Sequence, residues 1–165
     1  MAKVELLTRD NAPLLAQPFF QGGDPGPIAA ALAQVPELME TALPFIGSMF
    51  GPTAVEARIK EIVILRVSSA NSCHYCTETH TEVARRLNFT PDELAALRGE
   101  GPLPAVWVDR ERAAHQFSEA ISERPDSVVA ILRPHFSESE IVELVLLAAT
   151  TVMLNRFATA LELPV

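Results

Sequence analysis

Two helical patterns separated by a short polar break constrain the fold of this chain more than any other feature. Apolar residues recur at spacings of three and four across residues 53–70, as they do on the buried face of a helix. The pattern stops at Asn71 and Ser72, which are residue types that favour helix ends and N-caps, and a second helical segment follows. We therefore expect helices at 53–70 and 73–87 that fold back on each other as a central antiparallel hairpin.

Start and stop signals divide the rest of the chain into further helices. Thr90 and Ser137 are each followed three positions later by Glu, which is the capping-box pattern of a helix start. The other expected helices are 28–34, 36–50, 91–98, 109–123, 127–133 and 138–161. Because no segment shows the alternation of a strand, the sequence predicts an all-α fold, a single-domain helical bundle.

The first 27 residues differ in composition from the rest of the chain. They are rich in Pro and Gly and show no sustained helical period. We expect an extended N-terminal arm, 1–27, followed by a helical domain, 28–165. Arms of this kind often wrap a neighbouring subunit, and together with an apolar C-terminal helix they favour a homo-oligomer.

The composition excludes several classes of partner. A formal net charge of −8 argues against nucleic-acid binding, because that affinity comes largely from clustered Lys and Arg. The N-terminus lacks the continuous apolar stretch of a signal peptide, so we expect a cytoplasmic protein. The longest apolar run, 144–154, is shorter than the about 20 residues that cross a bilayer. We interpret it as a core or subunit-interface helix and expect no membrane partner.

Only two cysteines are present, Cys73 and Cys76, and they lie within four residues of each other. In a reducing compartment, a disulfide that closes so short a loop would stabilise little, so the pair needs a chemical explanation. At the start of a helix, unpaired N–H groups and the positive end of the helix dipole favour a thiolate over a thiol. Residues three and four apart share a helix face, which places Cys76 beside both Cys73 and His80. An imidazole there can accept the thiol proton.

Glu61 joins this group through the expected hairpin. If the chain reverses around residues 70 and 71, Glu61 lies opposite His80 on the facing helix. A carboxylate in that place can orient the imidazole and raise its basicity. The sequence therefore predicts a relay that runs from Glu61 through His80 to the cysteine pair.

Other interpretations of the same residues stay open. Zinc could bind the two cysteines and His80, with His74 or Glu61 as the fourth ligand. Helical spacing makes that site awkward, and the chain has no second metal-binding pair, so we expect no metal. The cysteines could also be buried core thiols without a chemical role. His115 and His135 are expected to be structural.

These residues in this order resemble the alkyl hydroperoxidase D-like (AhpD-like) family, also called the carboxymuconolactone decarboxylase family. The match consists of Glu61, the pair Cys73 and Cys76 with His and Tyr between them, and His80. A less specific similarity extends from about residue 36 to the Asn-Arg-Phe segment at 155–157. The resemblance implies an all-α fold with the hairpin, assembly into trimers or hexamers, and dithiol-dependent reduction of peroxides.

The resemblance also implies roles for the site residues. Cys76 would attack the peroxide and become a sulfenic acid, and Cys73 would resolve it to a disulfide. His80 and Glu61 would be the proton relay. The family's founding peroxidase has His immediately before the second cysteine, whereas this chain has Tyr75 there. A phenol can donate a hydrogen bond to a sulfur or a peroxide oxygen, but it is no base near neutral pH.

The sequence thus predicts an oxidoreductase, a thiol-dependent peroxidase with no cofactor beyond its redox-active Cys73 and Cys76. Its expected partners are a small-molecule hydroperoxide and a dithiol reductant or redox protein. An alternative is a disulfide reductase or adaptor that passes electrons to a partner such as a peroxiredoxin. Decarboxylation of a lactone and a zinc-binding structural role are the remaining alternatives.

Overall fold

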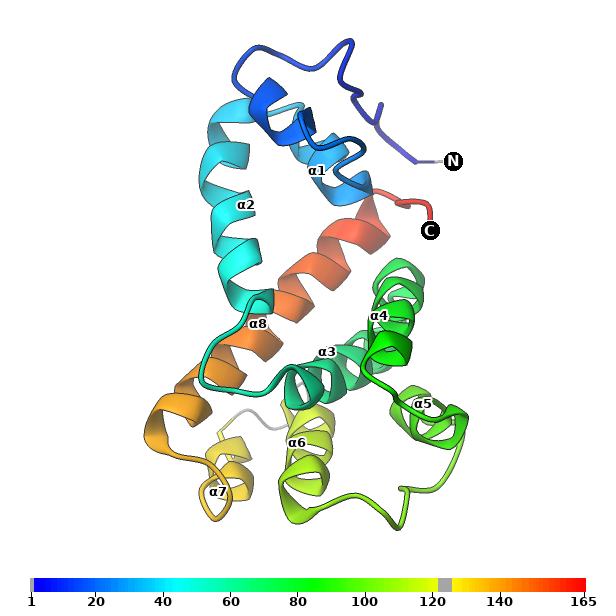
Figure 1. Cartoon of the computed structure of the whole chain (residues 1–165), viewed down its shortest axis with the longest axis vertical. Coiled ribbons are helices and arrows are strands. Elements are labelled where there is room, and N and C mark those ends of the chain that lie inside the picture. Colours follow the sequence, from blue (N-terminus) through cyan, green and yellow to red (C-terminus); the bar gives the residue numbers. More distant parts are fainter. Residues whose placement is uncertain (1, 122–125) are drawn as a thin grey trace.

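Helices make up the regular structure of the chain in the computed structural model, which describes residues 2–121 and 126–165 (Figure 1). They are a 3₁₀ helix, Gln17–Phe20, and α1 (Pro27–Leu32), α2 (Pro36–Phe50), α3 (Ala57–Ala70), α4 (His74–Arg86), α5 (Pro91–Arg98), α6 (Asp109–Ala120), α7 (Val128–Leu132) and α8 (Glu138–Ala160). No strand occurs in the described residues, so the predicted all-α class is confirmed. Residues 122 and 123 of the expected helix 109–123 lie outside the described part, and Ile121, which is described, follows the end of α6.

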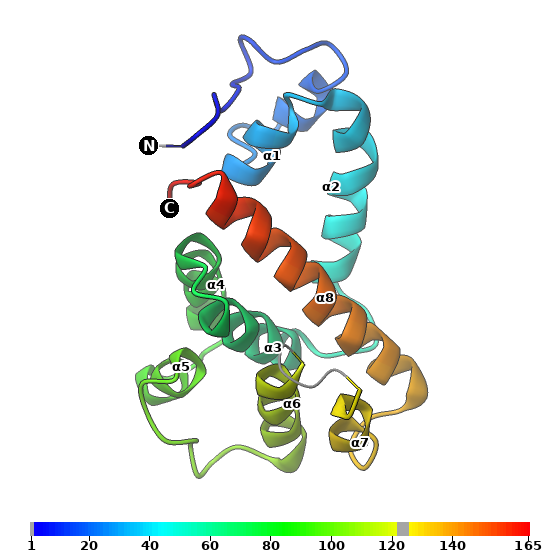
Figure 2. The same cartoon turned by 180° about the vertical axis from the view of Figure 1, so that it is seen from behind.

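Helix α3 lies at the centre of the fold. It packs against α4, α5, α6 and α8, and Ile62, Val63 and Val67 of its predicted apolar face are fully buried. In both views α8 runs from the α7 end of the molecule to α1, near which both termini lie (Figures 1 and 2). The main core therefore forms where α3 contacts α6 and α8. The start of α4 lies at the C-terminal end of α3.

The hairpin of α3 and α4 turns sharply at Ser72. This residue has a φ of 54°, in the left-handed region, and the Cys73 N–H donates to Ser68 O at 3.0 Å. Cys73 is itself the N-cap of α4, because its Sγ accepts a hydrogen bond from the Cys76 N–H at 3.4 Å. The predicted hairpin with the cysteine pair at a helix start is confirmed, with the helix beginning one residue later than expected.

Helix α3 begins at Ala57, four residues later than the expected start at 53. The buried side chain of Lys60 explains the difference. Its Nζ donates to Met49 O at 3.0 Å and to Gly51 O at 2.8 Å, and lies 3.0 Å from Glu143 Oε1. These contacts draw the chain after α2 across the start of α3, and a helix from 53 could not keep them.

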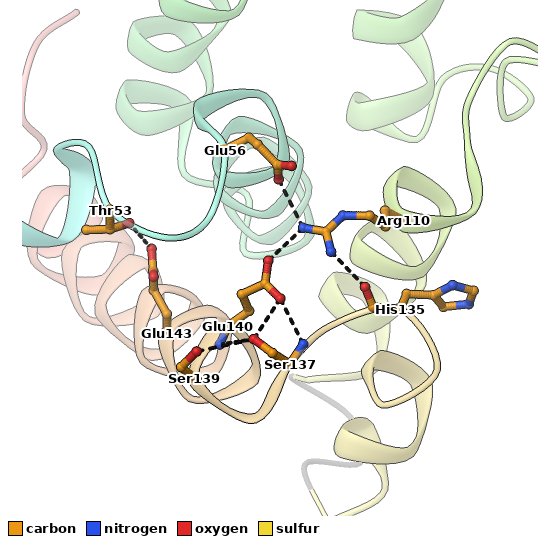
Figure 3. Close-up of polar contacts among 8 residues, drawn as sticks. All are labelled: Thr53, Glu56, Arg110, His135, Ser137, Ser139, Glu140 and Glu143. Carbon is orange, nitrogen blue, oxygen red and sulfur yellow. Dashed lines mark hydrogen bonds and ion pairs between the residues drawn. The ribbon is translucent and has the colours of Figure 1, made fainter.

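The capping boxes predicted at Thr90 and Ser137 are both present. At Ser137 the box belongs to a larger network (Figure 3), in which Glu140 accepts from Ser137 and from the Arg110 guanidinium at 2.8 Å. Arg110 also donates to Glu56 at 3.1 Å and to His135 O at 2.7 Å. The pKa of Glu140 is lowered to about 2, mainly by the hydrogen bond from Arg110. The network holds the start of α8 against α6 and against the N-cap of α3, so we assign it to the stability of the fold.

The residues before α1 pack on their own chain. Leu7, Ala16 and Phe20 form a small second core with Ala33 and Met39 of the α1–α2 region. Backbone hydrogen bonds from residues 3 and 7 reach the end of α8 and α1, at 2.8 and 3.1 Å. The predicted division into an arm, 1–27, and a domain, 28–165, stays a prediction.

Helix α8 is longer than the apolar run 144–154 of the sequence. With 23 residues and a mean hydropathy of 1.6 over its most apolar window, it is long and apolar enough to cross a membrane by length and composition alone. Half of that window is buried inside the fold. Leu144, Leu147 and Ala148 are fully buried, as the interpretation as a core helix requires.

Candidate thiol redox site

The two cysteines lie at the first turn of α4, where the backbone brings them together. Both are free thiols in the structure, and both are buried, with 1% of Cys73 and 6% of Cys76 exposed. The Cys76 N–H points at Cys73 Sγ because it is one of the N–H groups that the first turn of a helix leaves unpaired. Backbone geometry alone thus supplies a donor to one of the sulfurs.

The thiols titrate as a pair. The pKa of Cys73 is lowered to about 6, first by a hydrogen bond from the Cys76 thiol and then by the Cys76 N–H, with Asn155 and Thr159 adding to the effect against burial. The pKa of Cys76 is raised, because its proton is shared with Cys73 and because it is buried. Near pH 6 the pair therefore loses one proton, and the proton that remains on Cys76 bridges the two sulfurs.

This pairing predicts the pH dependence of thiol alkylation. A lowered pKa populates the thiolate above about pH 6, so the rate of reaction with iodoacetamide should rise through pH 6 and level off near pH 7. In urea-unfolded protein the midpoint should return toward the ordinary thiol value of 9.0. Replacing Cys76 with Ala removes the bridging thiol, so the midpoint for Cys73 should rise. A folded wild-type protein that alkylates with a midpoint near 9 would contradict the pairing.

The predicted pairing of Glu61 with His80 is present. His80 Nδ1 lies 3.0 Å from Oε2 and 3.2 Å from Oε1 of Glu61, which projects from α3 and is buried. The ring of Phe50 packs against the imidazole at 5.5 Å between centroids. Because Nδ1 is held by the carboxylate, Nε2 is the nitrogen that remains for a group in the cavity. Their predicted catalytic role stays a prediction.

A cavity of about 230 Å³ joins His80 to one side of the cysteine pair. Cys76 and His80 both line it, although the structure records no hydrogen bond between them in the described residues. The remaining lining residues come from α1, α2, α3, α4, α8 and the segment before α1: Pro25, Ile28, Ala29, Leu43, Ile46, Phe50, Ile64, Ser68, Tyr75, Thr79, Thr151, Leu154 and Asn155. The wall is mostly apolar, and no Lys, Arg, Asp or Glu belongs to it.

Tyr75 also faces this cavity. Burial is the main reason that its pKa is raised, with a smaller contribution from the nearby sulfurs. The phenol therefore keeps its proton at neutral pH, so it can donate a hydrogen bond but cannot act as a base. This agrees with the chemistry expected from the sequence.

Cys73 opens on the opposite side of α4. It lines a polar surface hollow of about 250 Å³ with Ser69, Ser72, His74, Thr77, Glu78, Arg98 and Glu100. Residues 74, 77 and 78 fall on one face of α4 and residues 75, 76, 79 and 80 on the other, and Cys73 is the N-cap that precedes them. The dithiol therefore lies between an apolar cavity and a polar hollow that share no lining residue.

Asn155 is a site residue that the sequence prediction did not assign. It projects from α8, is 1% exposed, lines the cavity with Cys76, and its side chain lowers the pKa of both cysteine thiols. Its signal in the sequence is a carboxamide inside an apolar helix, since a buried polar side chain has to be hydrogen-bonded. Its partner could not be named before α8 was placed beside the cysteines.

The remaining histidines do not join the site. His115 is buried beside Trp107, with 5.8 Å between ring centroids, and His135 lies in the turn before α8. His74 is exposed at the polar hollow. Within residues 2–121 and 126–165, no three His, Cys, Asp or Glu side chains come together as metal ligands would.

Known proteins are similar to this chain in sequence and in fold. The model of the carboxymuconolactone decarboxylase family matches residues 36–120. The chain is similar to the uncharacterized protein YdfG of Bacillus subtilis, with 29% identity over 114 residues, which span 66% of this chain and 77% of that protein.

Two solved structures extend the comparison. One is a protein of unknown function from Agrobacterium tumefaciens, proposed to be the antioxidant defence protein AhpD; it has a TM-score of 0.70 and 25% identity, covering 82% of this chain and 96% of that one. The other is the debrominase Bmp8, a cysteine-to-alanine variant in complex with 2,3,4-tribromopyrrole. It has a TM-score of 0.82 and 22% identity, and the match covers 99% of this chain and 91% of that one. The expected AhpD-like fold is confirmed, and the chain belongs to the carboxymuconolactone decarboxylase family.

Proposed function

We propose that this protein is a thiol-dependent peroxidase, an oxidoreductase that reduces an organic hydroperoxide through Cys76 and Cys73. The observation that carries the proposal is that Cys76 opens into an apolar cavity beside His80, which Glu61 holds by Nδ1. A cavity without charged walls suits an uncharged organic hydroperoxide. Similarity to a proposed AhpD adds support.

In the first step, the Cys76 sulfur attacks the terminal oxygen of the hydroperoxide. His80 Nε2 accepts the proton that Cys76 shares with Cys73, and Glu61 stabilises the resulting imidazolium through Nδ1. The O–O bond breaks, and the leaving alkoxide takes the proton and departs as an alcohol. Tyr75 donates a hydrogen bond to the departing oxygen. The sulfur becomes a sulfenic acid, and the peroxide is reduced by two electrons.

In the second step, the Cys73 thiolate attacks the sulfenic sulfur of Cys76. A disulfide forms, and hydroxide leaves and is protonated to water. The low pKa of Cys73 favours this step, because the resolving sulfur is already deprotonated at neutral pH. A dithiol reductant then returns both cysteines to thiols by two thiol–disulfide exchanges.

The test is the mass of each thiol-alkylated form after brief exposure to one equivalent of tert-butyl hydroperoxide. Wild type should form a disulfide, which resists alkylation. Cys73→Ser should hold a sulfenic acid on Cys76, which dimedone traps. If neither protein reacts within minutes while its thiols still titrate, the peroxidase proposal fails. A sulfenic acid on Cys73 in Cys76→Ser, and none on Cys76, would exchange the two roles.

A disulfide reductase or adaptor is a second candidate, favoured by the polar hollow at Cys73. A partner's cysteine can approach a surface hollow with both charge signs, here Arg98 and Glu78 at 3.0 Å from each other, more readily than the apolar cavity. Stopped-flow oxidation by a peroxiredoxin disulfide and by peroxide separates the candidates. Faster oxidation by the protein disulfide would favour the adaptor.

Two other activities, debromination and lactone decarboxylation, should be assayed beside peroxide reduction. The similar debrominase was solved with a bromopyrrole, and the cavity here is apolar and includes the Phe50 ring. Bromide release from 2,3,4-tribromopyrrole that outpaces peroxide reduction would replace the peroxidase proposal with reductive dehalogenation. A Cys76→Ser protein that decarboxylates a muconolactone at the full wild-type rate would count against any thiol chemistry.

A homo-oligomer in the cytoplasm is the proposed setting. Val142, Leu146 and Met153 are 66%, 44% and 49% exposed, and their spacing places them on one face of α8. We expect light scattering to give a trimer or a hexamer. Leu146→Glu should shift the mass toward monomer, whereas Val106→Glu, at an exposed loop residue, should not. A monomeric wild type at micromolar concentration would contradict this expectation.

A further inference from the structure

We propose that Asn155 is a catalytic residue of the thiol cycle, whose amide N–H donates to the thiolate, and that Asn71 and Arg156 are the positioning residues that aim it. This inference rests on the proposed function in one respect, since it takes the cysteine pair as the working centre. It assigns a role to three polar residues that the proton relay does not use.

The first argument is the place of Asn155. It comes from α8, yet it hydrogen-bonds to Ser68 of α3 and lines the same cavity as Cys76 of α4. Its neighbours along α8, Leu154 and Ala158, are buried and apolar. A carboxamide in such surroundings is costly unless its donors and acceptor are all paired. Here the oxygen is paired with Asn71 and one hydrogen with Ser68, which leaves the second hydrogen for the sulfurs, consistent with the lowered pKa of Cys73.

The second argument is the orientation of the carboxamide. Asn155 Oδ1 accepts from Asn71 Nδ2 at 3.2 Å, and the same Nδ2 donates to Val67 O at 2.9 Å. Asn71 is thus fixed as the donor, which leaves Asn155 Nδ2 to point the other way. Nδ2 donates one hydrogen to Ser68 Oγ at 3.0 Å, and the second hydrogen is the one available to the sulfurs.

The third argument is the direction of the whole chain of hydrogen bonds. Arg156 Nη2 donates to Asn71 Oδ1 at 3.4 Å, and Asn71 donates to Asn155 at 3.2 Å, so in the proposed chain Asn155 donates to the cysteine sulfurs. Every donor points from the guanidinium toward the thiolate, so each bond polarises the next. Negative charge at the sulfur is therefore stabilised by a cation on the surface, while the cavity wall itself stays uncharged.

The test measures the thiolate directly, by absorbance at 240 nm and by the pH dependence of iodoacetamide alkylation. Asn155→Leu removes the donor at similar volume, and Asn155→Asp keeps the shape but brings a carboxylate to the sulfurs. We expect Asn155→Leu to raise the midpoint pH of thiolate formation from about 6 by about one unit, which slows alkylation at pH 6 about fivefold. Asn155→Asp should raise it further. Neither variant replaces any of the titratable groups that surround the pair, which are His74, Tyr75, Glu78, His80 and Glu162.

The positioning role is tested on the exposed Arg156. Arg156→Gln should raise the midpoint by less than Asn155→Leu does, and Arg156→Lys should restore part of the shift. The matched control is Arg133→Gln, which removes an exposed guanidinium at the other end of α8 and should leave the midpoint unchanged. A merely structural role for Arg156 would lower thermal stability without moving the pH profile.

Two results would overturn the inference. One is a folded Asn155→Asp or Asn155→Leu protein whose midpoint matches that of wild type. The other is an Arg156→Gln midpoint that equals wild type, which would remove Asn71 and Arg156 from the proposal even if an Asn155 variant failed to fold. None of these titrations needs peroxide. Shifted midpoints in a protein that reduces no hydroperoxide would keep Asn155 in its role and reject the peroxidase.

Discussion

Cys76→Ser is expected to abolish hydroperoxide reduction, with a loss of about 10³-fold or more in kcat/KM in the presence of excess dithiothreitol. The reason is that Cys76 is the sulfur that opens into the apolar cavity, beside the His80 imidazole. A serine hydroxyl there is a far weaker nucleophile toward an O–O bond and cannot form the disulfide. The measurement is the steady-state consumption of tert-butyl hydroperoxide, with the dithiothreitol background subtracted.

Cys73→Ser is the matched control for that variant, because it removes the same atom three residues away. It lacks the resolving thiol but keeps the attacking one, so one equivalent of peroxide should still be consumed in a burst. Turnover should continue slowly if dithiothreitol reduces the sulfenic acid directly. Equal loss of the burst in both variants would mean that Cys76 is not the sole attacking sulfur.

Lys60→Met is expected to lower the free energy of unfolding by about 3 kcal/mol or more, the largest stability effect that we predict for a single side chain. The Lys60 side chain is 3% exposed and its Nζ donates to Met49 O and Gly51 O, while Glu143 Oε1 lies 3.0 Å away. Without it, two carbonyls lose a donor and a carboxylate of low exposure loses its cation. Urea unfolding followed by circular dichroism gives the free energy.

Lys3→Met provides the comparison, because Lys3 is paired with Glu162 at the surface, with 62% of its side chain exposed. It should change stability by at most about 0.5 kcal/mol. A Lys60→Met, Glu143→Leu double variant should lose less than the sum of the two single losses, since the charges contact each other. Additive losses, or a Lys60→Met protein as stable as Lys3→Met, would show that the buried pair contributes little.

The order and type of the helices could be predicted from the sequence because their causes are local. Apolar spacing, the acids three residues after Thr90 and Ser137, and the break at Asn71 and Ser72 act over a few residues. The pairing of Glu61 with His80 followed from the same break, since a tight hairpin fixes which positions face each other. These predictions required only the rise and period of a helix.

The start of α3, the cavity and the role of Asn155 depended on contacts between distant segments. Lys60 is an ordinary helix former in the sequence, and only Met49 O, Gly51 O and Glu143 move the helix start to Ala57. Likewise, the spacing of the cysteine pair by itself placed both sulfurs at a helix start, where a thiolate is favoured. Which sulfur meets an apolar cavity and which a polar hollow was decided by the helices that pack on the two faces of α4. Asn155 reaches the sulfurs because α8 crosses α3 and α4 there, and no local pattern encodes that crossing.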